Sequence, residues 1–170
     1  NNVLISPPQQ NAPEVKAIGK KLTVTFQEDL QDSTTYTIDF GSAICDYNEK
    51  TPLVGYVYSF STGEHIDSLA ISGFVYNAAT LNPVSTVLVG IHRIVEDSAF
   101  STLPFARITR TNDEGAFTIH NVQPGSYRIY ALNDVSRDFL YQPGEGLAFI
   151  DSLIAPSFEV KMHSDTLWRD

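Results

Sequence analysis

Acidic and aromatic side chains gather in one stretch near the C-terminal end, residues 133–146 (NDVSRDFLYQPGEG). Its carboxylates come from Asp134, Asp138 and Glu145, and its aromatic rings from Phe139 and Tyr141. Loops of Asp, Asn and Glu supply the oxygen ligands that Ca²⁺ takes, and an exposed aromatic pair suits a sugar ring. We weigh these uses against capping of tight turns by the acids and packing of the rings against a neighbouring domain. These five residues are the candidate binding loop.

A second acidic cluster and the histidines are weaker candidates for a metal-binding site. Asp46, Asn48 and Glu49 stand close together, and turn capping and solvation explain them better than a bound cation does. We expect EF-hand spacing neither in this cluster nor in the group of Asp134, Asp138 and Glu145. The histidines are far apart in the chain and show no paired metal-ligand spacing; we expect those within strands to be surface or half-buried residues. They are His65, His92, His120 and His163.

Sequence motifs of catalysis are missing from the chain. We find no nucleophile elbow of the G-x-S-x-G type, no phosphate-binding loop and no dinucleotide fingerprint. The sequence therefore predicts no enzyme activity, no cofactor and no metal centre.

The composition indicates a folded, acidic chain of one or two domains. Its 170 residues include 42% hydrophobic residues, and the formal net charge is −9, so nucleic acid and anionic lipid are unsuitable partners. No segment approaches the roughly 20 apolar residues that cross a bilayer, and we expect no membrane insertion within this chain. The single cysteine, Cys45, excludes an internal disulfide; its place in the alternating run IDFGSAIC predicts a buried small residue.

Alternation of apolar and polar residues predicts an all-β protein. Short runs bounded by Gly, Pro, Asn or Asp are typical of antiparallel sandwiches, and only residues 145–154 (EGLAFIDSLI) permit a helical face. The expected strands cover residues 3–6, 14–18, 21–26, 35–40, 55–61, 69–76, 85–94, 105–111, 116–122, 126–132, 147–150 and 157–162.

Two turns in the second half are specified by their residues. NDEG at 112–115 predicts a hairpin between the strands at 105–111 and 116–122, with Gly115 at positive φ. QPGSY at 123–127 predicts a second turn, after which Tyr127 takes the position of a tyrosine corner. LQDSTTYTIDF at 30–40 repeats this pattern and makes Tyr36 the second structural corner. Two corners about 90 residues apart indicate two consecutive sandwiches.

The first part resembles bacterial Ig-like domains of the kind found in surface-layer proteins. The resemblance lies in Leu30, Thr34, Tyr36 and Ile38, and in the closing YSFSTG. Between them it continues through Ile44, Asp46, Asn48, Glu49 and Leu53. Ig sandwiches of this kind have about 100 residues and seven strands, whereas five strands are expected here. We therefore expect an N-terminally truncated Ig-like domain over residues 1–65, with an open sheet edge or an uncovered apolar face.

The second part, residues 66–170, is similar to transthyretin-like or carboxypeptidase-regulatory-like sandwiches, which are related to Cna-B repeats. The resemblance lies in ISGFVYNAATLNPVSTVLVGI and RTNDEGAFTIHNVQPGSYRIYAL. Some Cna-B domains carry a Lys–Asn isopeptide bond, but SLAISGFVYN has no lysine, so we expect none.

The two resemblances together imply a bacterial cell-envelope protein of the Bacteroidetes lipoprotein type, anchored through sequence outside this chain. They imply a noncatalytic structural or protein-interaction module whose partner is an envelope protein. The alternative is a carbohydrate-binding accessory module, for which the aromatic residues at 139–141 and Trp168 must be exposed together on one face. The sequence does not identify the partner or the oligomeric state.

Overall fold

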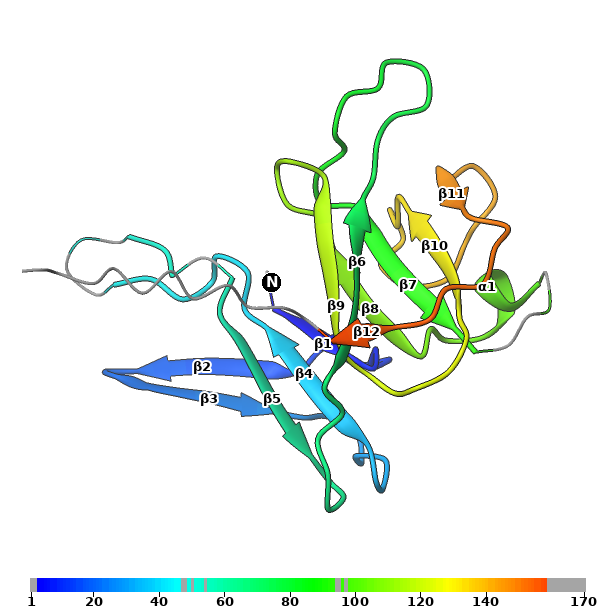
Figure 1. Cartoon of the computed structure of the whole chain (residues 1–170). Coiled ribbons are helices and arrows are strands. Elements are labelled where there is room, and N and C mark those ends of the chain that lie inside the picture. Colours follow the sequence, from blue (N-terminus) through cyan, green and yellow to red (C-terminus); the bar gives the residue numbers. More distant parts are fainter. Residues whose placement is uncertain are drawn as a thin grey trace, which may run out of the picture.

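The computed structural model describes residues 3–46, 49, 51–53, 55–93, 96 and 98–158. Its elements confirm the all-β prediction: nearly all regular structure is strand, paired in antiparallel sheets (Figure 1). The strands are β1 (Leu4–Ser6), β2 (Glu14–Ile18), β3 (Lys21–Thr25), β4 (Thr35–Asp39), β5 (Val57–Ser61), β6 (Leu69–Phe74), β7 (Leu88–His92), β8 (Arg107–Arg110), β9 (Ala116–Val122), β10 (Arg128–Leu132), β11 (Leu147–Phe149) and β12 (Ser157–Phe158).

The first part contains a three-stranded sheet in the order β1-β4-β5 and a two-stranded ribbon, β2-β3. The sheet buries Ile5, Tyr36, Ile38 and Phe40, and the ribbon contributes Val24 to the same cluster. In Figure 1 the ribbon projects away from the second part of the molecule. Its outer residues are largely exposed because one face of a two-stranded ribbon has no second layer to cover it.

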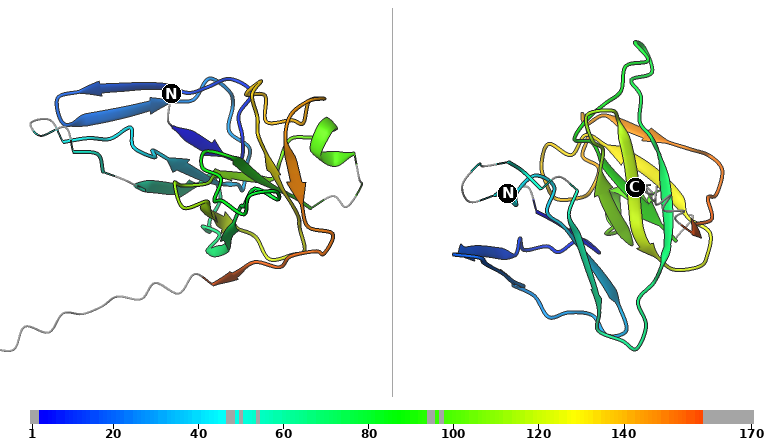
Figure 2. Two further views of the ribbon diagram at one scale, coloured as in Figure 1. Left: turned by 90° about the horizontal axis from the view of Figure 1, so that it is seen from above. Right: turned by 60° about the vertical axis from the view of Figure 1, so that its left-hand side comes forward.

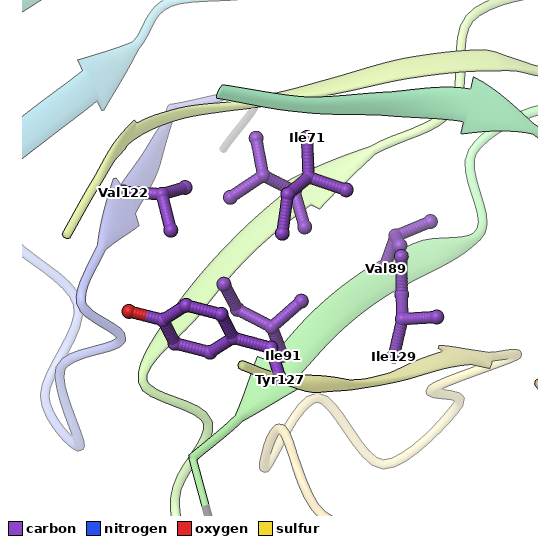
Figure 3. Packing of buried hydrophobic residues seen from close by; sticks show 7 residues of the cluster. Ile71, Val89, Ile91, Val122, Tyr127 and Ile129 are labelled. Carbon is purple, nitrogen blue, oxygen red and sulfur yellow. The ribbon is translucent and has the colours of Figure 1, made fainter. Parts of the chain in front are cut away.

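The second part is a sandwich of two sheets, ordered β11-β10-β7-β8 and β12-β6-β9. Figure 3 shows the side chains that fill the space between them, among them Ile71, Val89, Ile91, Val122 and Ile129. This is the alternation the sequence predicts, since neighbouring residues of one strand point to opposite faces.

The outer face of the four-stranded sheet is also buried. Leu88, Tyr130 and Leu132 lie on it and are covered by Phe105. The ring of Phe105 fills the space beside Gly90, where a Cβ atom would meet it at 2.4 Å. Gly90 is therefore required by close packing.

Helix α1 (Ala99–Thr102) contributes Phe100 to the side chains packed against this face. The helical face that residues 145–154 permit does not form, whereas the strand expected at 147–150 does. Those residues contain β11, whose Leu147 and Phe149 pair with Leu132 and Tyr130 of β10. Pairing with a neighbouring strand decides the conformation here, and a weak local helical pattern does not.

The turn at 112–115 has the predicted chemistry but not the predicted partners. Gly115 takes φ +71°, and Asn112 and Ala116 are joined across the turn by a backbone hydrogen bond of 2.9 Å. Beyond that bond the strands separate, because β8 pairs with β7 and β9 pairs with β6. The turn therefore connects the two sheets of the sandwich, and the expected hairpin is wrong.

The two parts lie against each other at the N-terminal strand. β1 pairs with β4 in the first sheet and also contacts β8 of the sandwich. Its side chains divide accordingly: Leu4 joins the cluster on the outer face of the second part, and Ile5 joins the core of the first. Figure 2 shows this strand between the two parts in both views.

Candidate functional site

The candidate binding loop, Asp134–Glu145, is closed by hydrogen bonds from its own backbone to its carboxylates. Asp134 Oδ1 accepts from the Arg137 amide at 2.7 Å, and Glu145 Oε1 accepts from the Val135 amide at 2.8 Å. The second oxygen of Glu145 accepts from the Gln142 amide at 3.0 Å. The acids of this loop therefore act first as acceptors that hold its shape.

These contacts favour the charged forms of two acids. The backbone amide of Gln142 is the main influence that lowers the pKa of Glu145, with further amides from Ser136 and Val135. Burial opposes ionisation of Asp138, but hydrogen bonds from the Leu140 amide and the Gln142 side chain lower its pKa overall. Both side chains are therefore negatively charged at neutral pH.

The spacing of the oxygen-bearing residues in this loop matches a known calcium-binding pattern. Counted from Asp134, the oxygen-bearing residues Ser136, Asp138 and Glu145 stand at positions 3, 5 and 12, the ligand positions of an EF-hand calcium loop. Position 6, usually glycine, is Phe139, which takes a positive φ of 61°. The expectation that neither acidic cluster has EF-hand spacing is therefore wrong for Asp134, Asp138 and Glu145.

The same acids are not assembled as a metal centre. In the part of the chain that the structure describes, no group of three or more His, Cys, Asp or Glu side chains is arranged to hold a metal ion. The hydroxyl of Ser136 instead lies among the carboxylates, 3.2 Å from Asp134 Oδ1 and 2.9 Å from Asp138 Oδ1. Bound Ca²⁺ would have to replace these hydrogen bonds.

The aromatic residues of the loop pack inward. Phe139 and Tyr141 are half-buried and lie against the cluster on the outer face of the sandwich. Tyr141 contacts Phe100 of α1 edge-on, with ring centroids 5.4 Å apart, and its amide donates to the Phe100 carbonyl. The two rings thus do not form the exposed platform that the carbohydrate alternative requires, and Trp168 lies outside the described residues.

Two other sequence-based expectations change in the structure. Cys45 is exposed, so its predicted burial is wrong. The alternation that suggested burial ends at Phe40, and Gly41 turns the chain at φ +52°. In the neighbouring acidic cluster the Glu49 amide donates to Asp46 Oδ1 at 2.8 Å, which is turn capping; Asn48 lies outside the described residues.

His92 differs from the expected surface or half-buried histidine. It is 2% exposed and lies beside the rings of Phe105 and Tyr130, with centroids 4.6 and 6.0 Å away. Its Nε2 atom has no hydrogen-bond partner, and burial lowers its pKa from 6.5 to about 4. His120 is half-buried in β9 and His65 is exposed, whereas His163 lies outside the described residues.

The two tyrosines expected at sandwich corners are buried, and their hydroxyls bind upstream backbone. Tyr127 donates to the Gln123 carbonyl at 2.9 Å and accepts from Arg93 Nε at 3.1 Å. Tyr36 accepts from the Gln31 amide at 2.9 Å. Each hydroxyl fixes the turn that leads into its strand.

A polar cluster at the junction of the two parts is not visible in the sequence. We call it the junction cluster; it contains Ser6, Thr37, Ser59, Asp67, Arg107 and Asn121. The Asn121 side chain accepts from Thr37 Oγ1 at 2.8 Å and from Ser59 Oγ at 2.7 Å. Its Nδ2 atom donates to the Asp67 carbonyl at 2.6 Å.

Arg107 completes the junction cluster from β8. Its guanidinium is buried, donates to the Ser6 carbonyl at 3.0 Å, and lies 3.6 Å from Asp67 Oδ2. Burial lowers the pKa of Arg107, and the charge of Asp67 opposes that change. A buried ion pair of this kind adds little net stability, because the cost of removing the charges from water offsets their attraction.

These features define an all-β protein whose polar contacts hold loops and a junction in place. A family model described as Bacterial Ig-like domain matches residues 1–62 and supports an Ig-like domain there. No curated protein and no solved structure matches the chain. Among the described residues, no helix has the length and apolar character needed to cross a membrane.

Proposed function

We propose that this chain is a noncatalytic structural and protein-interaction unit of the bacterial cell envelope. It consists of an Ig-like domain, residues 1–65, and a transthyretin-like sandwich, residues 66–170, and it is anchored through sequence outside this chain. Its role is to hold two modules at a fixed angle and to present the sandwich to an envelope protein. The Ig-like match and the all-β fold support a noncatalytic role.

The junction cluster is the observation that supports a fixed angle most directly. Asn121 of the second module bonds to two strands of the first and to the connecting segment. Freely moving domains meet through small contacts or a flexible linker, whereas here one half-buried side chain bonds to three partners. Breaking these bonds leaves the buried Thr37 hydroxyl without its acceptor, and a buried unsatisfied polar group costs about 1–3 kcal/mol.

Shared apolar packing supports the same role. Leu4 and Ile5 are adjacent in β1, yet they are buried in the clusters of different modules. A hinge motion between the modules would expose one of them. Because burial of a Leu or Ile side chain contributes roughly 1.5–3 kcal/mol, the closed arrangement is favoured.

The candidate binding loop has a secondary place in this function. Asp134, Asp138 and Glu145 keep an exposed segment in a defined shape, and loops of this kind carry recognition more often than strands do. We propose that its exposed acidic edge, with Phe139 and Tyr141 as inward anchors, faces the partner.

Distance measurements between spin labels test the fixed angle. One label is placed at Thr23→Cys in β3 and the other at Thr80→Cys in the sandwich, with Cys45→Ser to remove the exposed native thiol. A control pair, Thr80→Cys with Asp151→Cys, lies within the second module. We expect the distance distribution between modules to be as narrow as that of the control. A broad distribution between modules with a narrow control would refute the role.

A further inference from the structure

One side of the sandwich opens into an apolar groove between the edges of its two sheets. The groove has a volume of about 330 Å³. β6 forms one wall, with Ile71 and Phe74, and the opposite wall includes Phe149 and Ile150 beside β11. Its floor includes Val89, a residue of the core itself. No charged side chain lines it.

The β6 wall is a sheet edge that is only partly covered. β12 pairs with it at Leu69 and Ala70, and within the described residues no strand pairs with Ile71–Phe74 on that side. The chain before β12 is held elsewhere, because Ile154 exchanges two backbone hydrogen bonds of 2.8 and 2.9 Å with Tyr127 in the other sheet. Figure 1 shows β12 across one end of β6. The remaining length of the edge can accept another strand.

The uncovered part of this edge carries neither the charged residue nor the proline that commonly prevents strand addition. Residues 69–76 (LAISGFVY) include no charged residue and no proline, whereas exposed edges are usually blocked by Lys, Pro or a covering element. Phe74 and Tyr76 are 62% and 53% exposed, and their rings stack with centroids 6.1 Å apart. An added strand would gain backbone hydrogen bonds and cover this apolar surface.

Exposed acidic residues lie next to segments that line the groove and indicate the charge of the strand. Asp113 and Glu114 are exposed in the turn whose Gly115 carbonyl accepts from the Val75 amide at 2.8 Å. Asp151 is exposed directly after Ile150, which lines the opposite wall. A second copy of this chain, with its own net charge of −9, is repelled over long range.

We propose that the groove binds an extended segment of a partner protein, with alternating apolar residues and Lys or Arg at its ends, which adds to the β6 edge as a new strand. The apolar side chains of the segment enter the groove, and its basic ends lie beside Asp113, Glu114 and Asp151. This inference rests on the interaction role proposed above and names the chemical class of its partner.

A pair of synthetic peptides tests it. Both contain the core Thr-Val-Thr-Val-Thr-Val; one carries two lysines at each end and the other two glutamates. With the isotope-labelled full chain, we expect the lysine peptide to shift the amide signals of residues 70–76 and to slow their hydrogen exchange. We expect the glutamate peptide to bind at least tenfold more weakly at low salt. Absence of binding by the lysine peptide at 1 mM, or shifts away from residues 70–76, would overturn the proposal.

Matched variants distinguish binding at the β6 edge from nonspecific hydrophobic binding elsewhere on the protein. Phe74→Lys places a charge on the edge and is expected to abolish binding, whereas Ile18→Lys alters an exposed apolar residue of the β2-β3 ribbon and leaves binding unchanged. Light scattering of the protein alone must show a monomer; a dimer that Phe74→Lys dissociates would assign the edge to a second copy and overturn the proposal. The spin-label distances are independent of peptide binding, so failure here and failure of the fixed angle are distinguishable.

Discussion

Thr37 and Asn121 are 84 positions apart, yet the Oγ1 atom of Thr37 donates to Oδ1 of Asn121 at 2.8 Å. The bond joins β4 of the Ig-like part to β9 of the sandwich. Asn121 takes a positive φ of 58°, which asparagine tolerates better than most residues. Asparagine at this position therefore does two things: it accepts the positive φ, and its side chain makes the hydrogen bonds between the two parts.

Substitution of Asn121 separates these two roles. Asn121→Ala removes the side-chain bonds and keeps the strain, so we expect a loss of about 2–4 kcal/mol in the free energy of unfolding. Asn121→Gly removes the same bonds but accepts positive φ, and we expect it to be about 1 kcal/mol more stable than the alanine variant. Equilibrium urea unfolding measures both. Equal stabilities would show that φ at this position carries no strain.

The hydroxyl of Tyr127 has a measurable role in the corner of the sandwich. Tyr127→Phe removes its bonds to Gln123 and Arg93, and we expect a loss of about 1–2 kcal/mol. Tyr76→Phe is the control, since that ring is 53% exposed and water replaces any lost bond. If both variants melt at the wild-type temperature, the corner is held by packing alone.

Burial of His92 predicts loss of stability in acid. Its pKa is lowered from 6.5 to about 4, so between these values the unfolded chain takes up a proton that the folded chain does not. The stabilisation is complete above pH 6.5 and declines as the pH falls toward 4. Its full size is about 2 kcal/mol, allowing for screening by solvent.

His92→Phe tests this origin, because phenylalanine packs against Phe105 and does not titrate. The charged residue opposite His92 on β10 is Arg128, and the variant leaves it in place. We expect the slope of unfolding free energy against pH between 4 and 6.5 to be shallower in the variant. A change in packing caused by the substitution shifts the whole curve and does not alter its slope, so the slopes can be compared directly. If the curves of the wild type and the variant are parallel, the acid sensitivity belongs to other groups.

Asp134, Ser136, Asp138 and Glu145 have the spacing of calcium ligands, but Asp134 and Glu145 already accept hydrogen bonds from backbone amides, and the described acids form no metal centre. We therefore expect both EDTA and 5 mM Ca²⁺ to leave the melting temperature unchanged. Glu145→Gln removes a charged acceptor of these bonds and should lower the melting temperature, whereas Glu49→Gln, in the other acidic cluster, should not. Heat in titration calorimetry together with a rise in melting temperature in Ca²⁺ would contradict this prediction.

Strand positions were predictable because alternation is a local property. Residues 116–122 were predicted as a strand and form β9 over the same range. Partners were less predictable: the residues at 112–115 specify a turn and a positive φ at Gly115, but pairing depends on which strand meets each edge. For the same reason the helical face that residues 145–154 permit does not form, because Leu147–Phe149 pair with β10 as a strand.

The candidate site was predictable only in part. The acids and aromatic rings of the loop at 134–145 share one segment, so composition finds them, but their orientation depends on Phe100 in α1. The junction cluster has no local signal. Ser6, Asp67, Arg107 and Asn121 are individually ordinary, and only the packing of β1 against β8 brings them together.

Native-state hydrogen exchange tests most directly whether the two parts form one unit. The amides of Ile38 in β4 and Ile91 in β7 lie in the central strands of the two parts. We predict that both exchange through the same global opening, with opening free energies equal within about 1 kcal/mol and equally lowered by Asn121→Ala. An Ile38 amide that exchanges several kcal/mol more easily than Ile91 would contradict the account, because the Ig-like part would then unfold independently.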